Sequence, residues 1–144
     1  MSPEAPKLCM VGVTPENHNL IMWNKQEAAN ATLKFNLYKE GNTSNNFQKI
    51  GEIALNQSFT FNDSLVNAAV KSNRYAIQRT DLCNLNSQIS SPHQTMHLTI
   101  NKGVGTSWNL IWNSYVGFNV SINTTFRGCV LSGRNYQSKS LRPR

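Results

Sequence analysis

Apolar residues alternate with other residues along several short stretches of this chain. Between Leu33 and Lys39, the side chains of Leu33, Phe35 and Leu37 alternate with Lys, Asn and Tyr. A period of two puts every second side chain on one face of a β-strand, so one face of each stretch is expected to be buried. Stretches of this kind are Leu8–Val13, Asn19–Asn24, Leu33–Lys39, Phe47–Ala54, Ser58–Asn62, Arg74–Thr80 and Thr95–Ile100.

The links between these stretches indicate how the strands are connected. They are short and rich in asparagine, as in Asn42–Asn46 and Asn84–Asn86. Asparagine tolerates a left-handed backbone and bonds to its own main chain, so such clusters favour tight turns. Only Asp63–Lys71 has a helix-compatible pattern, and it is too short to be stable alone. We therefore expect an all-β fold, an antiparallel seven-stranded β-sandwich.

The composition suits one folded unit. The 144 residues are 39% hydrophobic, which fits one ordinary core. No apolar run approaches the roughly 20 residues of a membrane helix, so membrane insertion is not expected. Met1–Val13 lacks the basic start and apolar stretch of a signal peptide.

The net charge of +7 is unevenly distributed along the chain. Basic residues nearly balance all seven acidic residues up to Asp81, whereas no acidic residue follows it. The excess positive charge lies mostly in Arg127–Arg144, a polar and serine-rich segment that we interpret as a basic, flexible tail. Because interleaved aromatic residues and a helix-turn-helix pattern are missing, we do not expect nucleic acid to be the main partner.

Residues that carry chemistry are scattered. His93 and His97 would lie about 13 Å apart on an extended strand, too far for one metal ion. Gly103–Ser107 lacks the lysine of a phosphate loop, and the carboxylates occur singly. We therefore expect no catalytic residue, no metal site and no cofactor, and we interpret the protein as a non-enzyme.

The pattern resembles the fibronectin type III family, whose domains are immunoglobulin-like sandwiches. The resemblance is carried by Pro6, by Leu20-Ile21-Met22-Trp23 and by Phe35-Asn36-Leu37-Tyr38-Lys39. It continues through Phe61–Leu65 to Asn73–Ile77. It covers Pro6 to about Ile100, so residues 1–100 are interpreted as a fibronectin type III-like domain.

The resemblance implies structural roles for particular residues. It places Trp23 in the core and implies a tyrosine corner in which Tyr75 packs against Leu65. The remaining core positions that we expect are Phe35, Leu37 and Ile77.

Three cysteines are present, Cys9, Cys83 and Cys129, without C-x-x-C spacing. In the fibronectin topology, the start of the first strand and the end of the sixth lie at the same pole. The resemblance thus implies a disulfide between Cys9 and Cys83, if their Cα atoms come within about 7 Å. The alternative is two separate thiols, and Cys129 would remain unpaired in either case.

The end of the chain partly repeats its beginning. Leu98-Thr99-Ile100, a glycine-rich turn and Leu110-Ile111-Trp112 echo the first two stretches. Residues 101–144 are too few for a sandwich and are interpreted as the start of a second, incomplete β repeat. Because segment 95–118 is strongly apolar, we expect it to dock on the first domain, to self-associate, or to await the rest of a repeat.

These patterns suggest a function by class only. We expect a non-catalytic spacer or interaction module of a larger secreted or cell-surface bacterial protein, with neighbouring domains as partners. One alternative is a glycan- or peptide-binding module that uses loops 26–31 and 84–89. Those loops carry no aromatic platform, which favours the spacer. A nucleic-acid binder that uses the basic tail is a further alternative.

Overall fold

The computed structural model describes residues 2–24, 31–117, 125–126, 129–130 and 139–141. These residues form strands and turns and no helix. Segment Asp63–Lys71, which the sequence left open to a helix, forms turns beyond the end of a strand. The strands are β1 (Leu8–Val13), β2 (Asn19–Trp23), β3 (Thr32–Glu40), β4 (Phe47–Ala54), β5 (Thr60–Asp63), β6 (Arg74–Asp81), β7 (His93–Gln94), β8 (Leu98–Lys102), β9 (Trp108–Trp112), β10 (Thr125–Phe126), β11 (Cys129–Val130) and β12 (Lys139–Leu141).

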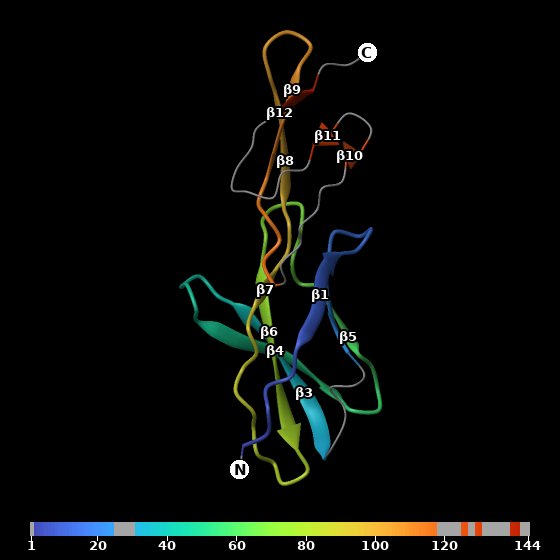
Figure 1. Cartoon of the computed structure of the whole chain (residues 1–144), viewed down its shortest axis with the longest axis vertical. Coiled ribbons are helices and arrows are strands. Elements are labelled where there is room, and N and C mark those ends of the chain that lie inside the picture. Colours follow the sequence, from blue (N-terminus) through green and yellow to red (C-terminus); the bar gives the residue numbers. More distant parts are fainter. Residues whose placement is uncertain (1, 25–30, 118–124, 127–128, 131–138, 142–144) are drawn as a thin grey trace.

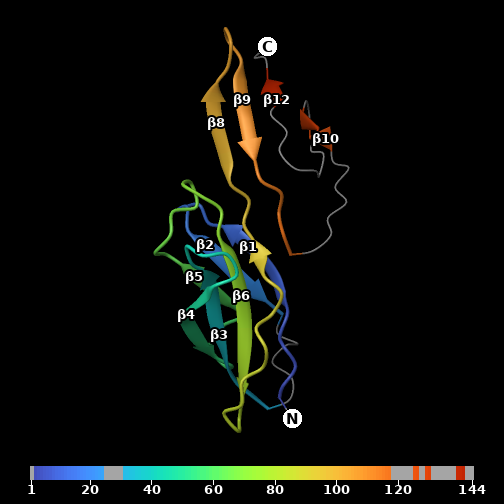
Figure 2. The same cartoon turned by 90° about the vertical axis from the view of Figure 1, so that its left-hand side faces the viewer.

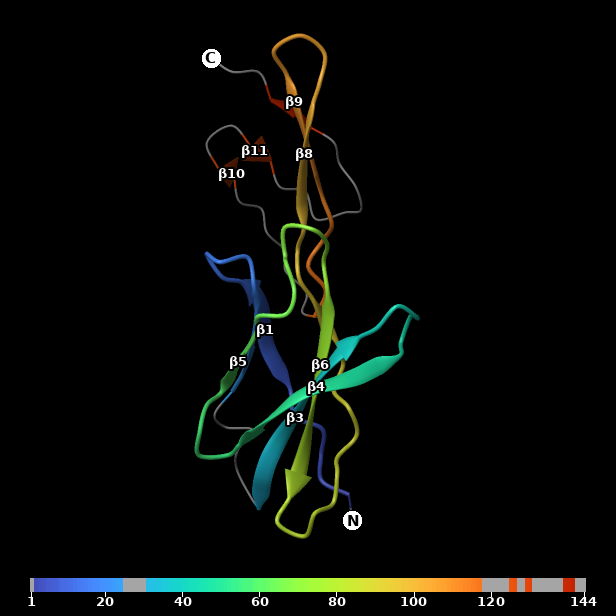
Figure 3. The same ribbon diagram turned by 180° about the vertical axis from the view of Figure 1, so that it is seen from behind.

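Two antiparallel sheets form the body of the molecule (Figure 2). One has the order β1-β2-β5, and the other has the order β4-β3-β6-β7. Tight turns with a left-handed asparagine connect neighbouring strands, at Asn17 between β1 and β2 and at Asn45 between β3 and β4. Figure 3 shows the β3–β4 turn, in teal, projecting from the side of the body.

The core lies between these two sheets. Each sheet contributes side chains from its inner face to it. Leu33, the first residue of the predicted alternating set on β3, is an exception, since it is 40% exposed. Trp23 of β2 and Phe35 of β3 are in contact, with ring centroids 5.4 Å apart. Phe61 of β5 lies so close to Gly51 of β4 that a Cβ there would come within 2.6 Å of the ring. The buried cluster consists of Leu8, Val11, Ile21, Trp23, Phe35, Leu37, Tyr75 and Ile77.

Five of the six predicted core residues are buried, and Leu65 is not. The exposed fraction of Leu65 is 94%, so the predicted packing of Leu65 against Tyr75 is wrong. The carboxylate of Asp63 accepts a hydrogen bond from the Leu65 N–H, which turns the chain after β5. Ala68 is the buried residue of this segment, and its N–H donates to the carbonyl of Asn17.

The Tyr75 hydroxyl instead joins a polar cluster between the sheets. It donates to Asp63 Oδ2 at 3.0 Å and accepts from Asn19 Nδ2 at 2.8 Å. Lys39 Nζ lies 3.0 Å from the same Asp63 oxygen. Asp63 is 4% exposed, so this buried carboxylate is paired and hydrogen-bonded, as a buried charge needs to be. Burial and, to a smaller extent, the Asp63 charge raise the pKa of Tyr75.

Residues Thr95–Ile100, which were expected to form one strand of the sandwich, do not form a single strand. The strand that follows β6 at the edge of its sheet is β7, and it ends before Thr95. Thr95 is buried, and its N–H donates to the Asn73 carbonyl at 3.0 Å. From Leu98 onward the chain forms β8, which pairs with β9 in a separate hairpin.

This β8–β9 hairpin projects beyond the body along the long axis of the molecule (Figure 1). On one edge of the hairpin, β12 pairs with β9, with Lys139 opposite Leu110. A strand at β12 differs from the expectation of a wholly flexible tail. The rest of that tail lies outside the described residues, apart from β11 and its pairing with β10.

The cysteines do not pair as the resemblance implies. Cys9 and Cys83 are both free and exposed. Cys9 lies at an irregularity between Leu8 and Met10 in the pairing of β1 with β2. Cys83 lies in the turn after β6, where its N–H donates to Asp81 Oδ1. The common pole therefore does not bring the two thiols together.

Candidate interaction surfaces

The base of the β8–β9 hairpin is attached to the body through Tyr115. The Val11 N–H of edge strand β1 donates to the Tyr115 hydroxyl at 2.9 Å. That hydroxyl lies 2.8 Å from His93 Nδ1 on β7, and the two rings meet edge to face. Tyr115 thus bridges β1 and β7, which belong to different sheets.

The electrostatics of this contact agree with its geometry. Burial lowers the pKa of His93 and raises the pKa of Tyr115. Both shifts favour the neutral form of the two groups. The imidazole nitrogen can therefore accept a hydrogen bond from the hydroxyl, while the hydroxyl oxygen accepts one from the Val11 N–H.

Backbone contacts continue this attachment. The Gln94 N–H donates to the Val116 carbonyl at 2.7 Å, so the segment after β9 extends the edge of β7. Gly117 follows with a φ of 147°, and a Cβ there would overlap the His93 ring. Only glycine satisfies both the backbone angle and this close approach.

Asn113 ties together the two chain segments that enter and leave the hairpin. Its Nδ2 donates to the Thr95 carbonyl at 3.0 Å, and its Oδ1 accepts the His97 N–H at 2.7 Å. His97 Nε2 also lies 2.9 Å from the Ala69 carbonyl in the turn after β5. The hairpin is therefore anchored to the body by side chains as well as by its two connections.

One face of the hairpin is mainly apolar and partly exposed. The pairing sets Leu98 opposite Trp112, Ile100 opposite Leu110 and Lys102 opposite Trp108. The alternate pairs are Thr99 with Ile111 and Asn101 with Asn109. Because successive side chains point to opposite faces, the first set shares one face. We call Leu98, Ile100, Trp108, Leu110 and Trp112 the hairpin face.

The hairpin face corresponds to the core face of β1 and β2. In the first hairpin Leu8 is opposite Trp23, and in the second Leu98 is opposite Trp112. The first pair is buried against the β4-β3-β6-β7 sheet, whereas Leu98 is 52% exposed and Trp108 is 51% exposed. Trp112 and Leu110 are partly buried. The second hairpin therefore leaves Leu98, Ile100 and Trp108 exposed on the face that corresponds to the buried face of the first.

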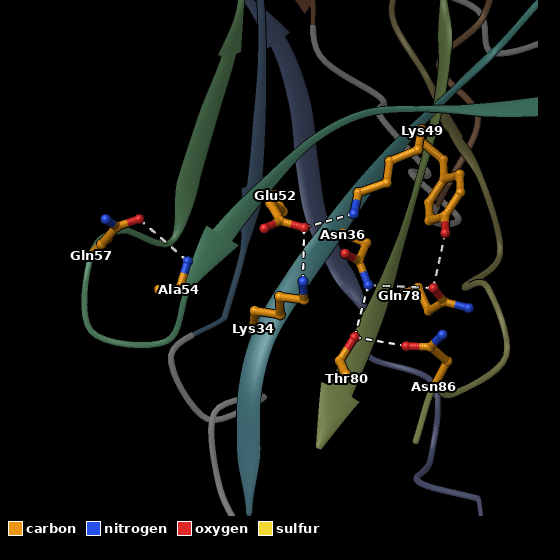
Figure 4. A network of polar contacts seen from close by, with 10 residues as sticks. Lys34, Asn36, Lys49, Glu52, Ala54, Gln57, Gln78, Thr80 and Asn86 are labelled. Carbon is orange, nitrogen blue, oxygen red and sulfur yellow. Dashed lines mark hydrogen bonds and ion pairs between the residues drawn. The ribbon is translucent and has the colours of Figure 1, made fainter. Parts of the chain in front are cut away.

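A second surface lies on the outer side of the β4-β3-β6-β7 sheet (Figure 4). It is a groove of about 260 Å³, and its lining is mostly polar. Strand pairing sets Asn36 at its centre, opposite Glu52 on β4 and Gln78 on β6. The lining residues are Lys34, Asn36, Tyr38, Lys49, Gln78, Thr80, Asn84 and Asn86.

Hydrogen bonds fix the floor of this groove. Asn36 Nδ2 donates to Thr80 Oγ1 at 2.9 Å, and Thr80 Oγ1 donates to Asn86 Oδ1 at 2.7 Å. The Tyr38 hydroxyl donates to Gln78 Oε1 at 2.9 Å. Asn36 is 4% exposed, and its Oδ1 has no hydrogen-bond partner among the described residues.

Charge is concentrated at one side of the groove. Lys49 and Lys34 donate to the same oxygen of Glu52, at 2.7 and 2.9 Å. These hydrogen bonds, with that of Lys49 the stronger, lower the pKa of Glu52 to about 2. Two ammonium groups therefore share one carboxylate, which leaves the groove with one excess positive charge.

Of the two loops proposed from the sequence as a binding site, the structure describes one in full. Loop 84–89 contributes Asn84 and Asn86 to the groove. Loop 26–31 lies outside the described residues, except for Ala31. The groove residues on β3 and β6 were missed, although they occupy the outward positions of the period-two pattern. Because polar residues are expected there on any sandwich, the pattern alone does not distinguish a groove from a solvated face.

Groups typical of metal sites do not gather in the described part of the chain. No three His, Cys, Asp or Glu residues there could hold one ion together. His93 is buried against Tyr115, whereas His97 contacts Ala69. Among these residues, no helix is both long and apolar enough to span a membrane.

Comparison with known proteins gives no further assignment. The chain matches no model of a known protein family, and no curated protein matches its sequence.

Proposed function

We propose that this protein is a non-catalytic, fibronectin type III-like module that acts as a spacer and interaction unit. The order of the two sheets, β1-β2-β5 against β4-β3-β6-β7, supports this interpretation. So does the buried tryptophan on β2, which packs on the opposite sheet. On the strength of the family resemblance, we place the module in a larger secreted or cell-surface bacterial protein.

The observation that carries the proposal is the anchored hairpin, whose apolar face leaves Leu98, Ile100 and Trp108 exposed. As in β1 and β2, its first leucine is opposite its last tryptophan, although the pairing of β1 with β2 has an irregularity that this hairpin lacks. We therefore interpret β8 and β9 as the first strands of a second sandwich. The contacts of Tyr115 and Asn113 would then hold two successive domains in a fixed relative orientation. A fixed orientation is what a spacer needs, since a flexible link does not set a distance.

The partner that fits the hairpin face is the inner face of another β-sheet. A sheet of that kind, from a neighbouring domain, would cover Trp112 as β3 covers Trp23. A second copy of the chain is the other partner that we propose, by self-association through residues 95–118. Both partners would remove the same exposed apolar surface from water.

Backbone ¹⁵N relaxation of the whole chain tests this proposal. If the hairpin is held rigidly, the amides of β8 and β9 will report the same overall tumbling time as those of β3 and β6. Tyr115→Ala should shorten the apparent tumbling time of the hairpin, whereas Tyr38→Ala, on the outer sheet face, should not. Independent fast tumbling of β8 and β9 in the unmodified chain would reject the spacer.

A further inference from the structure

We propose that the outer groove of the β4-β3-β6-β7 sheet binds an acidic, hydroxyl-rich saccharide of the uronic acid type. This site is separate from the hairpin face and goes beyond the proposed function as a spacer. It rests on three features of the groove, which are its hydrogen-bonding groups, its excess positive charge and its unpaired acceptor.

The hydrogen-bonding groups favour a polyol. Side-chain amides and hydroxyls of Asn36, Gln78, Thr80 and Asn86 line the groove. Amides both donate and accept, as do the hydroxyls of a sugar, so the two sets are complementary. An apolar ligand is disfavoured because it would cover these polar atoms without replacing their hydrogen bonds with water.

The direction of the hydrogen bonds in the groove floor determines which donors and acceptors face a ligand. Thr80 donates to Asn86 Oδ1, so the exposed Asn86 side chain presents its amide NH₂ as a donor. The chain of hydrogen bonds from Asn36 through Thr80 to Asn86 fixes these directions before any ligand arrives. Such preorganisation lowers the entropy that binding must overcome.

The excess positive charge selects an acidic sugar. Lys34 and Lys49 both pair with Glu52, and the side chains of the two lysines are 33% and 44% exposed. A ligand carboxylate can therefore take one ammonium group while Glu52 keeps the other. Charge-assisted hydrogen bonds of this kind are stronger than neutral ones.

The unpaired acceptor supplies a third contact. Asn36 Oδ1 is buried without a hydrogen-bond partner among the described residues, and Asn36 stands between Lys34 and Tyr38 on β3, opposite Glu52 on β4. Figure 4 shows the ammonium groups of Lys34 and Lys49 converging on Glu52 next to Asn36. When a ligand draws a lysine aside, a sugar hydroxyl can donate to this oxygen, which otherwise remains a buried, unsatisfied acceptor.

Titration of the whole chain with trigalacturonic acid, followed by ¹H–¹⁵N NMR, tests the proposal. We expect shifts confined to amides around the groove, and weaker binding as salt is added. Lys49→Met should weaken binding about tenfold, because it removes one charge-assisted hydrogen bond. Lys71→Met, a change of the same kind on the exposed turn after β5, should leave binding unchanged.

The neutral trisaccharide maltotriose distinguishes acid recognition from general sugar binding. It should bind at least about tenfold more weakly than trigalacturonic acid, since it offers no carboxylate. Equal binding of the two sugars, an equal effect of the two lysine substitutions, or no shifts up to about 10 mM trigalacturonic acid would each overturn the proposal.

Discussion

The Tyr75 hydroxyl and the Asp63 carboxylate form a 3.0 Å hydrogen bond between the two sheets of the body. Asp63 is paired across its own sheet with Asn19, and Tyr75 is paired across the other sheet with Lys39. All four side chains meet in one cluster. The cluster therefore fixes how the sheets are placed on each other at one end of the core, which apolar packing alone leaves less specific.

Replacing the hydroxyl should reveal the contribution of this cluster. Tyr75→Phe keeps the ring in the core but leaves Asp63 and Asn19 without their shared partner. We expect unfolding in urea to become easier by about 1 to 3 kcal/mol, the cost of unsatisfied buried polar groups. Tyr38→Phe, which removes a partly buried hydroxyl bonded to Gln78, should cost less. Equal losses would show that the cluster has no special role.

The same tyrosine should make the fold sensitive to alkali. The pKa of Tyr75 is raised in the folded protein, mainly by burial. Above about pH 10 the unfolded chain loses this proton while the folded chain retains it, so stability present below that pH is lost as the pH rises. Urea unfolding measured from pH 9 to 11 should show this loss, and Tyr75→Phe should have a smaller pH dependence.

Trp23 of the β1–β2 hairpin and Trp108 of the β8–β9 hairpin should contribute differently to the stability of the protein. Trp23→Ala removes a residue that is 3% exposed and should cost about 3 to 5 kcal/mol, most of the stability of a small domain. Trp108→Ala removes a side chain that is half exposed and should change stability by less than about 0.5 kcal/mol. Thermal unfolding followed by circular dichroism compares the two, and a mutant of Trp23 as stable as the parent would contradict the core assignment.

The strands of the body were predictable because their signal is local. The predicted stretches Leu8–Val13 and Phe47–Ala54 coincide with β1 and β4, and β3 and β6 differ from prediction only at their ends. Burial follows the predicted alternation only in part. Phe35 and Leu37 are buried, whereas Leu33, beside a shift in register, is 40% exposed. On β6, Tyr75, Ala76 and Ile77 are buried in succession. The all-β class and the antiparallel pairing follow from that alternation and from the asparagine turns.

The features that were missed depend on partners distant in sequence. Leu65 points outward because Asp63 and Tyr75 determine the path of the chain after β5. The break between Thr95 and Leu98 arises from bonds to Asn73 and Asn113. Neither the exposure of Leu65 nor the break after Thr95 alters the alternation of apolar residues, so the sequence of the segment alone could not predict either feature. The groove could not be predicted for the same reason, since its floor consists of residues from β3, from β6 and from the turn after β6.

The exposed cysteines should react in the folded protein. Because Cys9 and Cys83 are free and accessible, iodoacetamide should modify both without denaturant. Peptide mapping under non-reducing conditions then gives the modified positions. A recovered Cys9–Cys83 cross-linked peptide, or protection of both thiols until the chain unfolds, would contradict the structure.

The attachment of the hairpin should depend on one hydroxyl. Tyr115→Phe leaves the ring in place but removes the hydroxyl that accepts from the Val11 N–H and contacts His93 Nδ1, so we expect a loss of about 1 to 2 kcal/mol. The change should also expose the connections of the hairpin to proteolysis around Thr95 and Asn113, because local opening becomes easier. Tyr38→Phe serves again as the matched control.

A pH series separates this contact from the general stability of the body. The pKa of His93 is lowered by burial, so its contribution is present above about pH 6.5, the ordinary value for histidine, and is lost as the pH falls through the lower value of the folded state. Proteolysis at Thr95 and Asn113 should therefore accelerate in mildly acidic solution for the parent chain. In Tyr115→Phe it should be fast already at neutral pH and change less with acid. If cleavage of the parent chain begins instead within β3 or β6, the hairpin base is not the first part of the body to open, and the role given to Tyr115 is wrong.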